Sequence, residues 1–241
     1  MRNNATRAPS HFLVLPAAGS GQRMGGDRPK QYLELLGKPL LQHTLERLVL
    51  IDGFECIVLV LAADDPWWPG VETALSASVR MKLKVVEGGS ERFASVQNGL
   101  LALHDIAADN DWVLVHDVVR PCVGLDDVER LMQTLRDDPV GGLLASPVRE
   151  TLKRADGNGV VLQTIDRTGL WAAATPQMFR YRLLRDALQK TSATNRIVTD
   201  EAEAVEASGH PVKLVQGGAD NIKITWPQDL VLAALILAAG R

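Results

Sequence analysis

A group of glycines and cations near the start of the chain has the composition of an anion-binding loop. Residues 16–41 read PAAGSGQRMGGDRPKQYLELLGKPLL and follow a short apolar run at residues 12–15. Glycines let the backbone approach a ligand closely, so that its N–H groups can donate hydrogen bonds to phosphate oxygens. Arg23 and Lys30 lie seven residues apart in this loop and could neutralise the same anion. The sequence therefore predicts a phosphate-bearing ligand at this loop.

Two common phosphate-binding loops fit these residues poorly. A P-loop ends in Gly-Lys-Ser or Gly-Lys-Thr, and neither tripeptide occurs here. A dinucleotide-binding loop has the spacing Gly-x-Gly-x-x-Gly, opens a long helix and is followed by an acid about 20 residues later. Gly19, Gly21 and Gly25 instead have the spacing Gly-x-Gly-x-x-x-Gly, and Pro29 interrupts a long helix. For the glycines alone, a simple tight turn is the alternative, and Arg23 and Lys30 favour the phosphate ligand.

Lys223 is a further candidate for phosphate binding. It lies between Ile222 and Ile224 in an extended segment, residues 221–225. Side chains alternate along extended backbone, so Lys223 faces away from the two isoleucines. This orientation fits a lysine directed into a cleft, and it also fits a solvated strand face.

Two other segments place polar groups where a predicted strand ends. Gly88 and Gly89 follow one apolar run and precede a helical pattern, so the backbone there could approach a flat base. Ser90 next to them also fits a helix N-cap. Asp117 ends another strand, which is the favoured position for an active-site acid in an α/β sheet. His116 could act as a base, but we favour a structural role for it.

The elements that would position these residues alternate along the chain. Short apolar runs predict strands at 11–16, 55–62, 83–87, 112–116, 141–147 and 212–216. Amphipathic patterns predict helices near 40–51, 66–79, 91–106, 125–136, 180–190, 199–208 and 227–239. Such alternation indicates one α/β domain over 1–241, with a mostly parallel sheet covered on both faces.

The segment 148–175 interrupts this alternation. Two extended runs flank Asp156-Gly157-Asn158-Gly159, a strong hairpin signal, so we predict a protruding arm over about residues 148–172. The arm carries apolar residues that an isolated hairpin cannot bury, namely Leu152, Val160, Val161, Leu162 and Ile165. A homodimer with crossed arms would bury them.

Composition narrows the class of protein. The chain has 241 residues, 46% of them hydrophobic, and a formal charge of −3, which argues against nonspecific binding to nucleic acid. We find no apolar run of about 18 residues that would span a membrane. The two cysteines and five histidines lack the spacing of a disulfide framework or a metal site. We expect a cytoplasmic protein that does not bind membranes, with residues 1–10 as a flexible tail.

Several motifs occur together in one order along the chain. They are Pro16-Ala17-Ala18-Gly19-x-Gly21-x-Arg23-Met24, Lys30-Gln31, Gly88-Gly89-Ser90-Glu91-Arg92-x-x-Ser95, Val115-His116-Asp117-x-x-Arg120, Thr151-x-Lys153, Asp166-Arg167, Thr175-Pro176-Gln177, Thr199-Asp200-Glu201 and Asp220-Asn221-Ile222-Lys223. This set resembles the 2-C-methyl-D-erythritol 4-phosphate cytidylyltransferases of the non-mevalonate isoprenoid pathway. The resemblance implies a Rossmann-like nucleotidyltransferase fold, three-layer α/β/α with a protruding β-hairpin arm.

The resemblance also implies a reaction and roles for individual residues. An oxygen of 2-C-methyl-D-erythritol 4-phosphate would attack the α-phosphorus of CTP and release pyrophosphate, with Mg²⁺ held mainly by the triphosphate and no metal ligands from the protein. The catalytic cations would be Lys30, Lys223 and Arg23. Nucleotide binding would fall to Pro16, Ala17, Ala18, Gly19, Gly21, Gly88, Ser90, Ser95, Asp117 and Val118. The acceptor would contact Asp117, Arg120, Thr151, Arg167, Thr175 and Thr199, with Thr151 and Arg167 reaching the site of a partner subunit.

One departure and two alternatives accompany this interpretation. The family commonly has two alanines between the aspartate and the arginine, where this chain has Val118 and Val119, so the nucleotide pocket could be tighter. The shared nucleotide motifs would also fit a cytidylyltransferase for another polyol phosphate, such as ribitol 5-phosphate. A third hypothesis is a nucleotide-binding module with weakened or no transferase activity.

Overall fold

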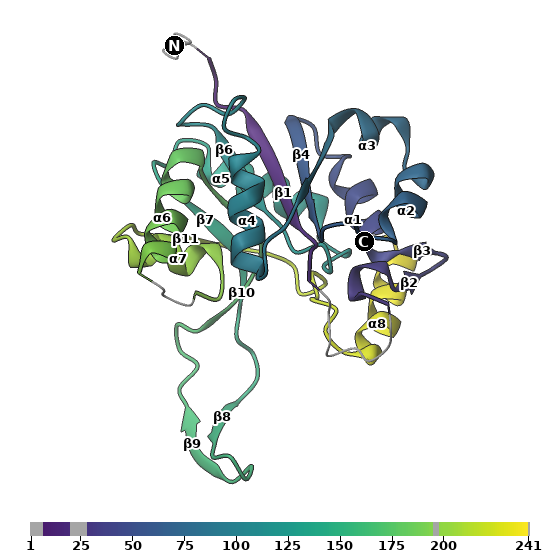
Figure 1. The fold of residues 1–241 in the computed structure, drawn as a ribbon. Coiled ribbons are helices and arrows are strands. Elements are labelled where there is room, and N and C mark those ends of the chain that lie inside the picture. The colour runs from purple at the N-terminus through teal and green to yellow at the C-terminus, as the bar shows by residue number, and fades with distance from the viewer. Residues whose placement is uncertain (1–6, 20–27, 195–197, 241) are drawn as a thin grey trace.

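The structure is a computed structural model, which describes residues 7–19, 28–194 and 198–240. Its main sheet contains β1 (His11–Pro16), β4 (Phe54–Leu61), β5 (Leu83–Glu87), β6 (Trp112–Val115), β7 (Gly141–Pro147), β10 (Trp171–Arg180) and β11 (Lys213–Gln216). Across the sheet the strands follow the order β11-β7-β10-β6-β1-β4-β5 (Figure 1). Neighbouring strands are parallel except at β10, which is antiparallel to both β6 and β7. The predicted mostly parallel sheet is therefore confirmed.

Both faces of this sheet are buried, because successive side chains of its central strands enter two different cores. In β1, Leu13 and Leu15 belong to one core, while Phe12 and Val14 belong to the other. The first core is completed by α1 (Leu40–Leu48), α2 (Trp68–Ala74), α3 (Ala77–Lys82), α5 (Leu125–Leu135) and α8 (Pro227–Ala238). The second is completed by α4 (Arg92–Leu101), α6 (Tyr181–Ala193) and α7 (Glu201–Ala207). A strand buried on both sides reads as a continuous apolar run, as these strands do in the sequence. The predicted three-layer α/β/α fold is confirmed.

The six predicted strands agree with the observed ones to within one residue at each end, but β10 was missed. We assigned residues 148–172 to the arm, whereas β10 begins at Trp171 and continues into the centre of the sheet. Its sequence contains Pro176, which cannot donate a ladder hydrogen bond and lowers the strand signal. The pairing of β10 with β7 shifts register between Ala173 and Gln177, which accommodates the proline.

The helices differ from prediction mainly in their ends. The single helix expected over 66–79 is two helices, α2 and α3. Ser76 separates them, because its side chain accepts a hydrogen bond from the Val79 N–H and starts a new helix. The helix expected over 91–106 ends at Leu101.

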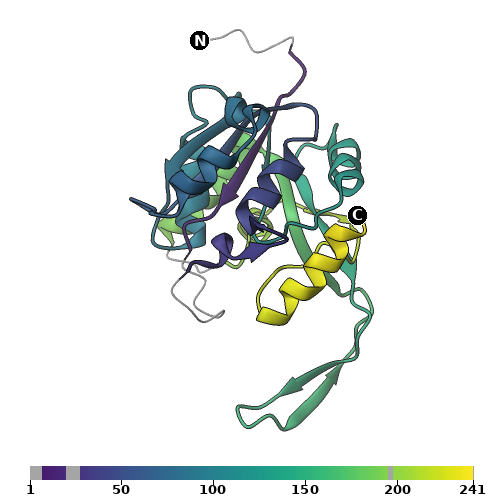
Figure 2. The same ribbon diagram turned by 90° about the vertical axis from the view of Figure 1, so that its right-hand side faces the viewer.

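The predicted arm is a hairpin of β8 (Leu152–Ala155) and β9 (Val161–Ile165) that projects away from the body of the molecule (Figures 1 and 2). The carboxylate of Asp156 accepts hydrogen bonds from the N–H groups of Asn158 and Val160, both at 2.9 Å. Gly159 has φ +81°, a conformation that glycine adopts without strain. These contacts confirm the hairpin turn that the sequence predicted.

Smaller elements lie beside the site and at the start of the chain. Residues 30–39 form a one-turn helix, η2 (Lys30–Tyr32), and a two-stranded ribbon, β2 (Glu34–Leu35) with β3 (Lys38–Pro39). Part of the predicted tail is anchored, since the Arg7 guanidinium pairs with Asp111 at 2.7 Å and Glu55 at 3.0 Å. In the described ranges, no helix has the length and apolar character needed to cross a bilayer.

The start of β7 generates a stability prediction. Gly141 has φ +132°, and a Cβ there would lie 2.1 Å from the carbonyl oxygen of Met178. Gly141→Ala should therefore lower the free energy of unfolding by roughly 2–4 kcal/mol, through backbone strain and overpacking. Urea unfolding measures the change. The control is Gly157→Ala at the hairpin tip, where a Cβ meets no atom within 4 Å and we expect a change within about 0.5 kcal/mol. Equal stabilities for the two variants would contradict this account.

Candidate active site

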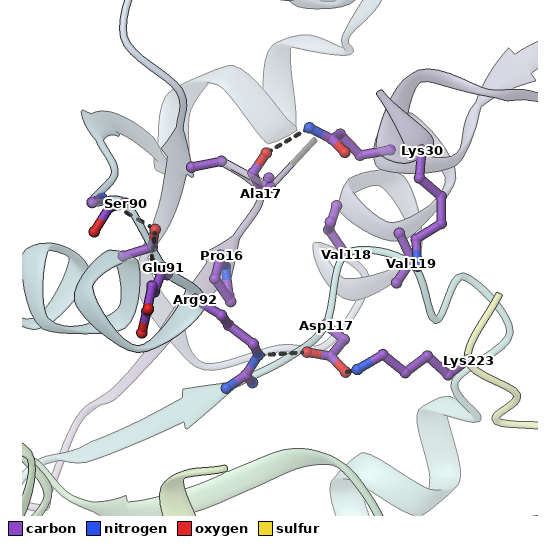
Figure 3. A pocket seen from close by; sticks show the side chains of 15 residues that line it. Pro16, Ala17, Lys30, Ser90, Glu91, Arg92, Asp117, Val118, Val119 and Lys223 are labelled. Atoms are coloured by element: carbon purple, nitrogen blue, oxygen red, sulfur yellow. Dashed lines mark hydrogen bonds and ion pairs between the residues drawn. The ribbon is translucent and has the colours of Figure 1, made fainter. Parts of the chain in front are cut away.

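Most of the predicted site residues that the structure describes gather at the carboxyl edge of the sheet. The ends of β1, β5 and β6 meet there because the strands between them run parallel. A cavity of about 250 Å³ opens at this edge (Figure 3). Ten predicted residues line it: Pro16, Ala17, Ala18, Gly19, Lys30, Ser90, Ser95, Asp117, Val118 and Lys223. Gly21 and Arg23, which we also predicted, lie outside the described residues.

Backbone and side-chain contacts with neighbouring elements fix the two ends of the glycine-rich loop. The Ala17 N–H donates to the Val60 carbonyl at 2.7 Å, which continues the pairing of β1 with β4 by one residue. The buried Gln31 side chain donates to the Ala17 carbonyl, also at 2.7 Å. On the far side of the loop, the Arg28 guanidinium lies 4.4 Å from the centre of the Trp67 ring. These contacts hold the entry and the exit of the loop against the body of the protein.

The glycine turn after β5 packs directly on the first loop. A Cβ on Gly88 would lie 2.5 Å from the Cβ of Ala18, so the two loops can approach this closely only with glycine at that position. The hydroxyl of Ser95 accepts from the Gly89 N–H at 3.2 Å and donates to the Glu91 carbonyl at 3.1 Å. The buried Ser95 therefore shapes the turn, and both Gly89 and Ser95 line the cavity.

The first residue of α4, which follows this turn, is a cation, and a helix N-terminus disfavours positive charge. The N-cap of α4 is Glu91, whose side chain makes no capping hydrogen bond, so the capping role considered for Ser90 is wrong. Arg92 is the first helical residue, and a cation there opposes the helix dipole. Its guanidinium must therefore be stabilised by partners elsewhere.

Asp117 provides one of those partners and is the centre of the site. Its carboxylate accepts from Arg92 Nε at 3.0 Å through Oδ1 and from Lys223 Nζ at 2.9 Å through Oδ2 (Figure 3). Arg120 Nε lies 3.6 Å from the same Oδ2. Burial alone would raise the pKa of Asp117, but the attraction of Arg92 and Lys223 outweighs burial and holds the pKa well below its usual range. The carboxylate thus stays ionised among three cations.

Glu201 provides the other partner of Arg92. Its two oxygens accept from Nη1 at 2.6 Å and from Nη2 at 3.1 Å, and the Glu201 side chain is only 2% exposed. Burial opposes the charged form of Arg92, but Glu201 and then Asp117 more than compensate and raise its pKa. Asp200 caps α7, whereas Glu201, the first residue of that helix, forms this buried ion pair.

His116 holds the backbone of Asp117 in place. Its Nε2 lies 3.2 Å from the carbonyl oxygen of Arg120, which can only accept, so Nε2 carries the proton. Its Nδ1 then accepts from the Thr175 hydroxyl at 3.1 Å, and that oxygen accepts from the Asp117 N–H at 3.0 Å. Burial lowers the pKa of His116 to about 4, so the ring is neutral near pH 7. These contacts agree with the structural role that we favoured for His116.

A second cavity of about 180 Å³ adjoins the first. The predicted acceptor residues Arg120, Thr175 and Thr199 line it. Asp117, Lys223 and Arg92 line both cavities. A reacting group in one cavity and a reacting group in the other would therefore meet the same three charged side chains.

Two predicted acceptor residues do not reach either cavity within one chain. Thr151 and Arg167 are exposed residues of the arm, and they are absent from both linings as described. The Arg167 side chain instead donates to the carbonyl of Arg149 in the arm.

The valines that replace the family's alanines fit within the core. Val118 is 4% exposed and Val119 is 8% exposed, and both pack in the first core while lining the cavity. The Val118 carbonyl accepts from the Thr44 hydroxyl at 2.7 Å, which ties this backbone to α1. The added methyl groups are thus accommodated without loss of the cavity.

Arg92 and Glu201 occur in the motifs of the sequence, but we predicted neither of them as a site residue. A usable signal existed for Arg92, because a cation in the first turn of a helix is unfavourable without partners. For Glu201 no signal existed, since an acid in the first turn of a helix needs no further explanation.

Comparisons with known proteins agree on one family. Residues 11–239 match the family model described as 2-C-methyl-D-erythritol 4-phosphate cytidylyltransferase. A curated relative of that name from Dechloromonas aromatica (strain RCB) is 53% identical, covering 97% of this chain and the whole of the relative. A solved 4-diphosphocytidyl-2C-methyl-D-erythritol synthase is 36% identical with a TM-score of 0.83, covering 96% of this chain and 100% of that one. The cytidylyltransferase of Francisella tularensis is 34% identical with a TM-score of 0.81, covering 94% and 99% of the two chains.

The buried His116 generates a prediction about pH. Its pKa is about 4 in the folded protein and about 6.5 in an unfolded chain, so between these values the unfolded chain binds the proton first. The free energy of unfolding should therefore fall as pH falls from 6.5 towards 4, with His116 contributing up to about 3 kcal/mol of the loss. His116→Gln lacks this titration and should show a shallower dependence. Urea unfolding at several pH values compares the two, and equal slopes would refute the assignment.

Proposed function

Because the chain belongs to the 2-C-methyl-D-erythritol 4-phosphate cytidylyltransferase family, it transfers a cytidylyl group from CTP to 2-C-methyl-D-erythritol 4-phosphate, and we propose that the two adjoining cavities are where it does so. The 250 Å³ cavity takes the nucleotide and the 180 Å³ cavity takes the acceptor phosphate. One observation carries this proposal: Asp117, Arg92 and Lys223 lie on the wall that both cavities share.

The reaction needs positive charge more than it needs a base. A phosphate oxygen of the acceptor forms a bond to the α-phosphorus of CTP, and the bond from that phosphorus to the bridging oxygen breaks. The electron pair of this bond leaves with pyrophosphate. The nucleophile is already an anion, so the barrier lies in bringing two anions together and stabilising the charge on a five-coordinate phosphorus. The neutral, fully bonded His116 fits a reaction without a protein base.

The cations of the site have distinct positions for this work. Lys30 lines the nucleotide cavity and Lys223 lines both cavities, so both can contact the reacting phosphate. Arg120 lines the acceptor cavity, and its Nη1 donates to the Asn221 carbonyl at 2.7 Å, which leaves further N–H groups for the acceptor phosphate. Arg23 in the glycine-rich loop would hold the triphosphate, as the sequence predicts.

We propose that a magnesium ion enters with the nucleotide and is held mainly by its phosphates. Among the residues that the structure describes, no group of three or more His, Cys, Asp or Glu side chains could hold a metal ion. Asp117 is a carboxylate that lines both cavities, and its two oxygens already pair with Arg92 and Lys223. Mg²⁺ is commonly held by substrate phosphates and one or two carboxylates. Bound in this way, it would neutralise negative charge on the phosphates.

The arm completes the site from a second copy of the chain. Val160, Val161 and Leu162 of the arm are between 56% and 64% exposed, which is unusual for three consecutive large apolar residues. A homodimer would bury them and would carry Thr151 and Arg167 to the acceptor cavity of the partner. A cytoplasmic location stays a prediction from the sequence.

The remaining alternatives can be separated from this function by measurement. An acceptor panel that includes ribitol 5-phosphate distinguishes another polyol phosphate from 2-C-methyl-D-erythritol 4-phosphate. A nucleotide-binding module without transferase activity would bind CTP and release no pyrophosphate. The intact cluster of charges around Asp117 favours an active enzyme.

The first test removes the cations one at a time. Lys30→Ala and Lys223→Ala should each lower the rate of pyrophosphate release by about 10²–10³-fold, because each removes positive charge from the transition state. The assay contains CTP, Mg²⁺ and 2-C-methyl-D-erythritol 4-phosphate. Lys190→Ala serves as the control, since Lys190 is exposed on α6 and lines neither cavity, and it should keep full activity. Wild-type rates for both site variants would defeat the proposed site.

A second test concerns the dimer. Leu162→Asp places a charge on the apolar tip of the arm, so we expect the wild-type chain to sediment as a dimer and the variant as a monomer with little activity. Leu50→Asp is the matched control, because Leu50 is 67% exposed in a turn after α1, away from the arm. A fully active wild-type monomer at micromolar concentration would rule out the composite site.

A further inference from the structure

Four segments that are distant in the sequence form one continuous chain of charges. Glu201 at the start of α7 pairs with Arg92 at the start of α4, Arg92 pairs with Asp117 after β6, and Asp117 pairs with Lys223 before α8. The Glu201 end is buried, and the Lys223 end is 41% exposed at the cavities. This series of ion pairs therefore runs from the protein interior at Glu201 to the proposed reaction centre at Lys223.

The hydrogen bonds between Arg92 and Glu201 determine how the two oxygens of Asp117 are divided between Arg92 and Lys223. Glu201 occupies both terminal nitrogens of the guanidinium, which leaves Nε for Oδ1 of Asp117. The second carboxylate oxygen, Oδ2, is then left for the ammonium group of Lys223 at 2.9 Å. An arginine without such a restraint binds a carboxylate with two parallel N–H groups, one to each oxygen. That geometry would occupy both oxygens of Asp117 and compete with Lys223.

We propose that Glu201 is a positioning residue for cytidylyl transfer, which orients Arg92 so that Asp117 keeps one oxygen for Lys223. The inference rests on the proposed role of Lys223 at the reacting phosphate. Glu201 itself lines neither cavity but is hydrogen-bonded to Arg92, which lines both, so it acts through Arg92.

The Glu201 side chain is not needed to cap α7. The N-terminus of α7 is satisfied without its side chain, because Asp200 accepts from the Glu203 N–H at 2.9 Å and Gln177 accepts from the Ala202 N–H at 2.8 Å. An acid that only favoured the helix dipole could point into solvent. Burying a carboxylate instead is costly unless it is paired, so its burial against Arg92 indicates that this pair is what the position provides.

The experiment compares Glu201→Gln with the wild-type enzyme under saturating CTP and acceptor. We expect kcat to fall by about 10–100-fold, as for a small displacement of a reacting group, while KM for CTP changes by less than about threefold. Glu206→Gln is the matched control, since it removes the same charge from an exposed position of the same helix and should keep wild-type kinetics.

A double-variant cycle distinguishes positioning from general damage to the fold. In the Lys223→Ala background, Glu201→Gln should lower the remaining rate by less than about twofold, because the group that it positions is gone. A loss as large as in the wild-type background, or wild-type activity for Glu201→Gln itself, would overturn the inference. If Lys223→Ala keeps wild-type activity, the proposed site fails instead, so the two failures are distinguishable.

Glu201→Asp covers the case in which the glutamine variant does not fold. It retains the charge but shortens the side chain by one methylene, so the carboxylate can still neutralise Arg92 but cannot hold both nitrogens in the same place. We expect thermal unfolding to show a stable protein. If Glu201→Gln folds, the kcat of Glu201→Asp should lie between those of the wild type and Glu201→Gln. If Glu201→Gln does not fold, the kcat of Glu201→Asp should be at least about fivefold below wild type. A stable aspartate variant with unchanged kcat would overturn the proposal as well.

Discussion

The carboxylate of Asp117 is the group that allows this site to exist before any substrate arrives. Arg92, Arg120 and Lys223 converge on one partly desolvated edge of the sheet and would repel one another without it. The buried carboxylates of Asp117 and Glu201 lower that repulsion, and three cations against two carboxylates leave the cluster net positive. In the proposed function, a polyphosphate entering the cavities would supply the negative charge that is still missing. The pairing thus stabilises the empty site while its net positive charge would attract an anionic substrate.

The fold positions this carboxylate by simple means. Parallel strands bring the ends of β1, β5 and β6 to one edge, so segments separated by tens of residues contribute side chains to one cleft. The antiparallel β10 then places Thr175 beside His116, and their hydrogen bonds fix the N–H of Asp117. The proton positions in this small network follow from the acceptor-only carbonyl of Arg120. A neutral histidine thus contributes rigidity and no chemistry.

The sequence predicts the features that depend on neighbouring residues, and it does not predict contacts between residues that lie far apart in the chain. Strands buried on both faces leave continuous apolar runs, and the turn at Asp156 has its own short signature, so both were predictable. β10 was not, because Pro176 and three consecutive alanines weaken the strand signal in its first half. The alternation around Lys223 indicated its exposed orientation but not its partner. The pair of Arg92 and Glu201 spans 109 positions, and no local pattern announces a contact of that separation.

Beside the cavity that we propose for the nucleotide, the backbone of the Gly88–Gly89 turn is closely packed. Gly88 meets Ala18 with no room for another carbon atom, and the hydroxyl of Ser95 is committed to holding the turn. Main-chain groups cannot be exchanged by substitution, and the side chains that support them cannot change without distorting the turn. If an inhibitor formed its hydrogen bonds with this backbone, few single amino-acid substitutions could cause resistance to it.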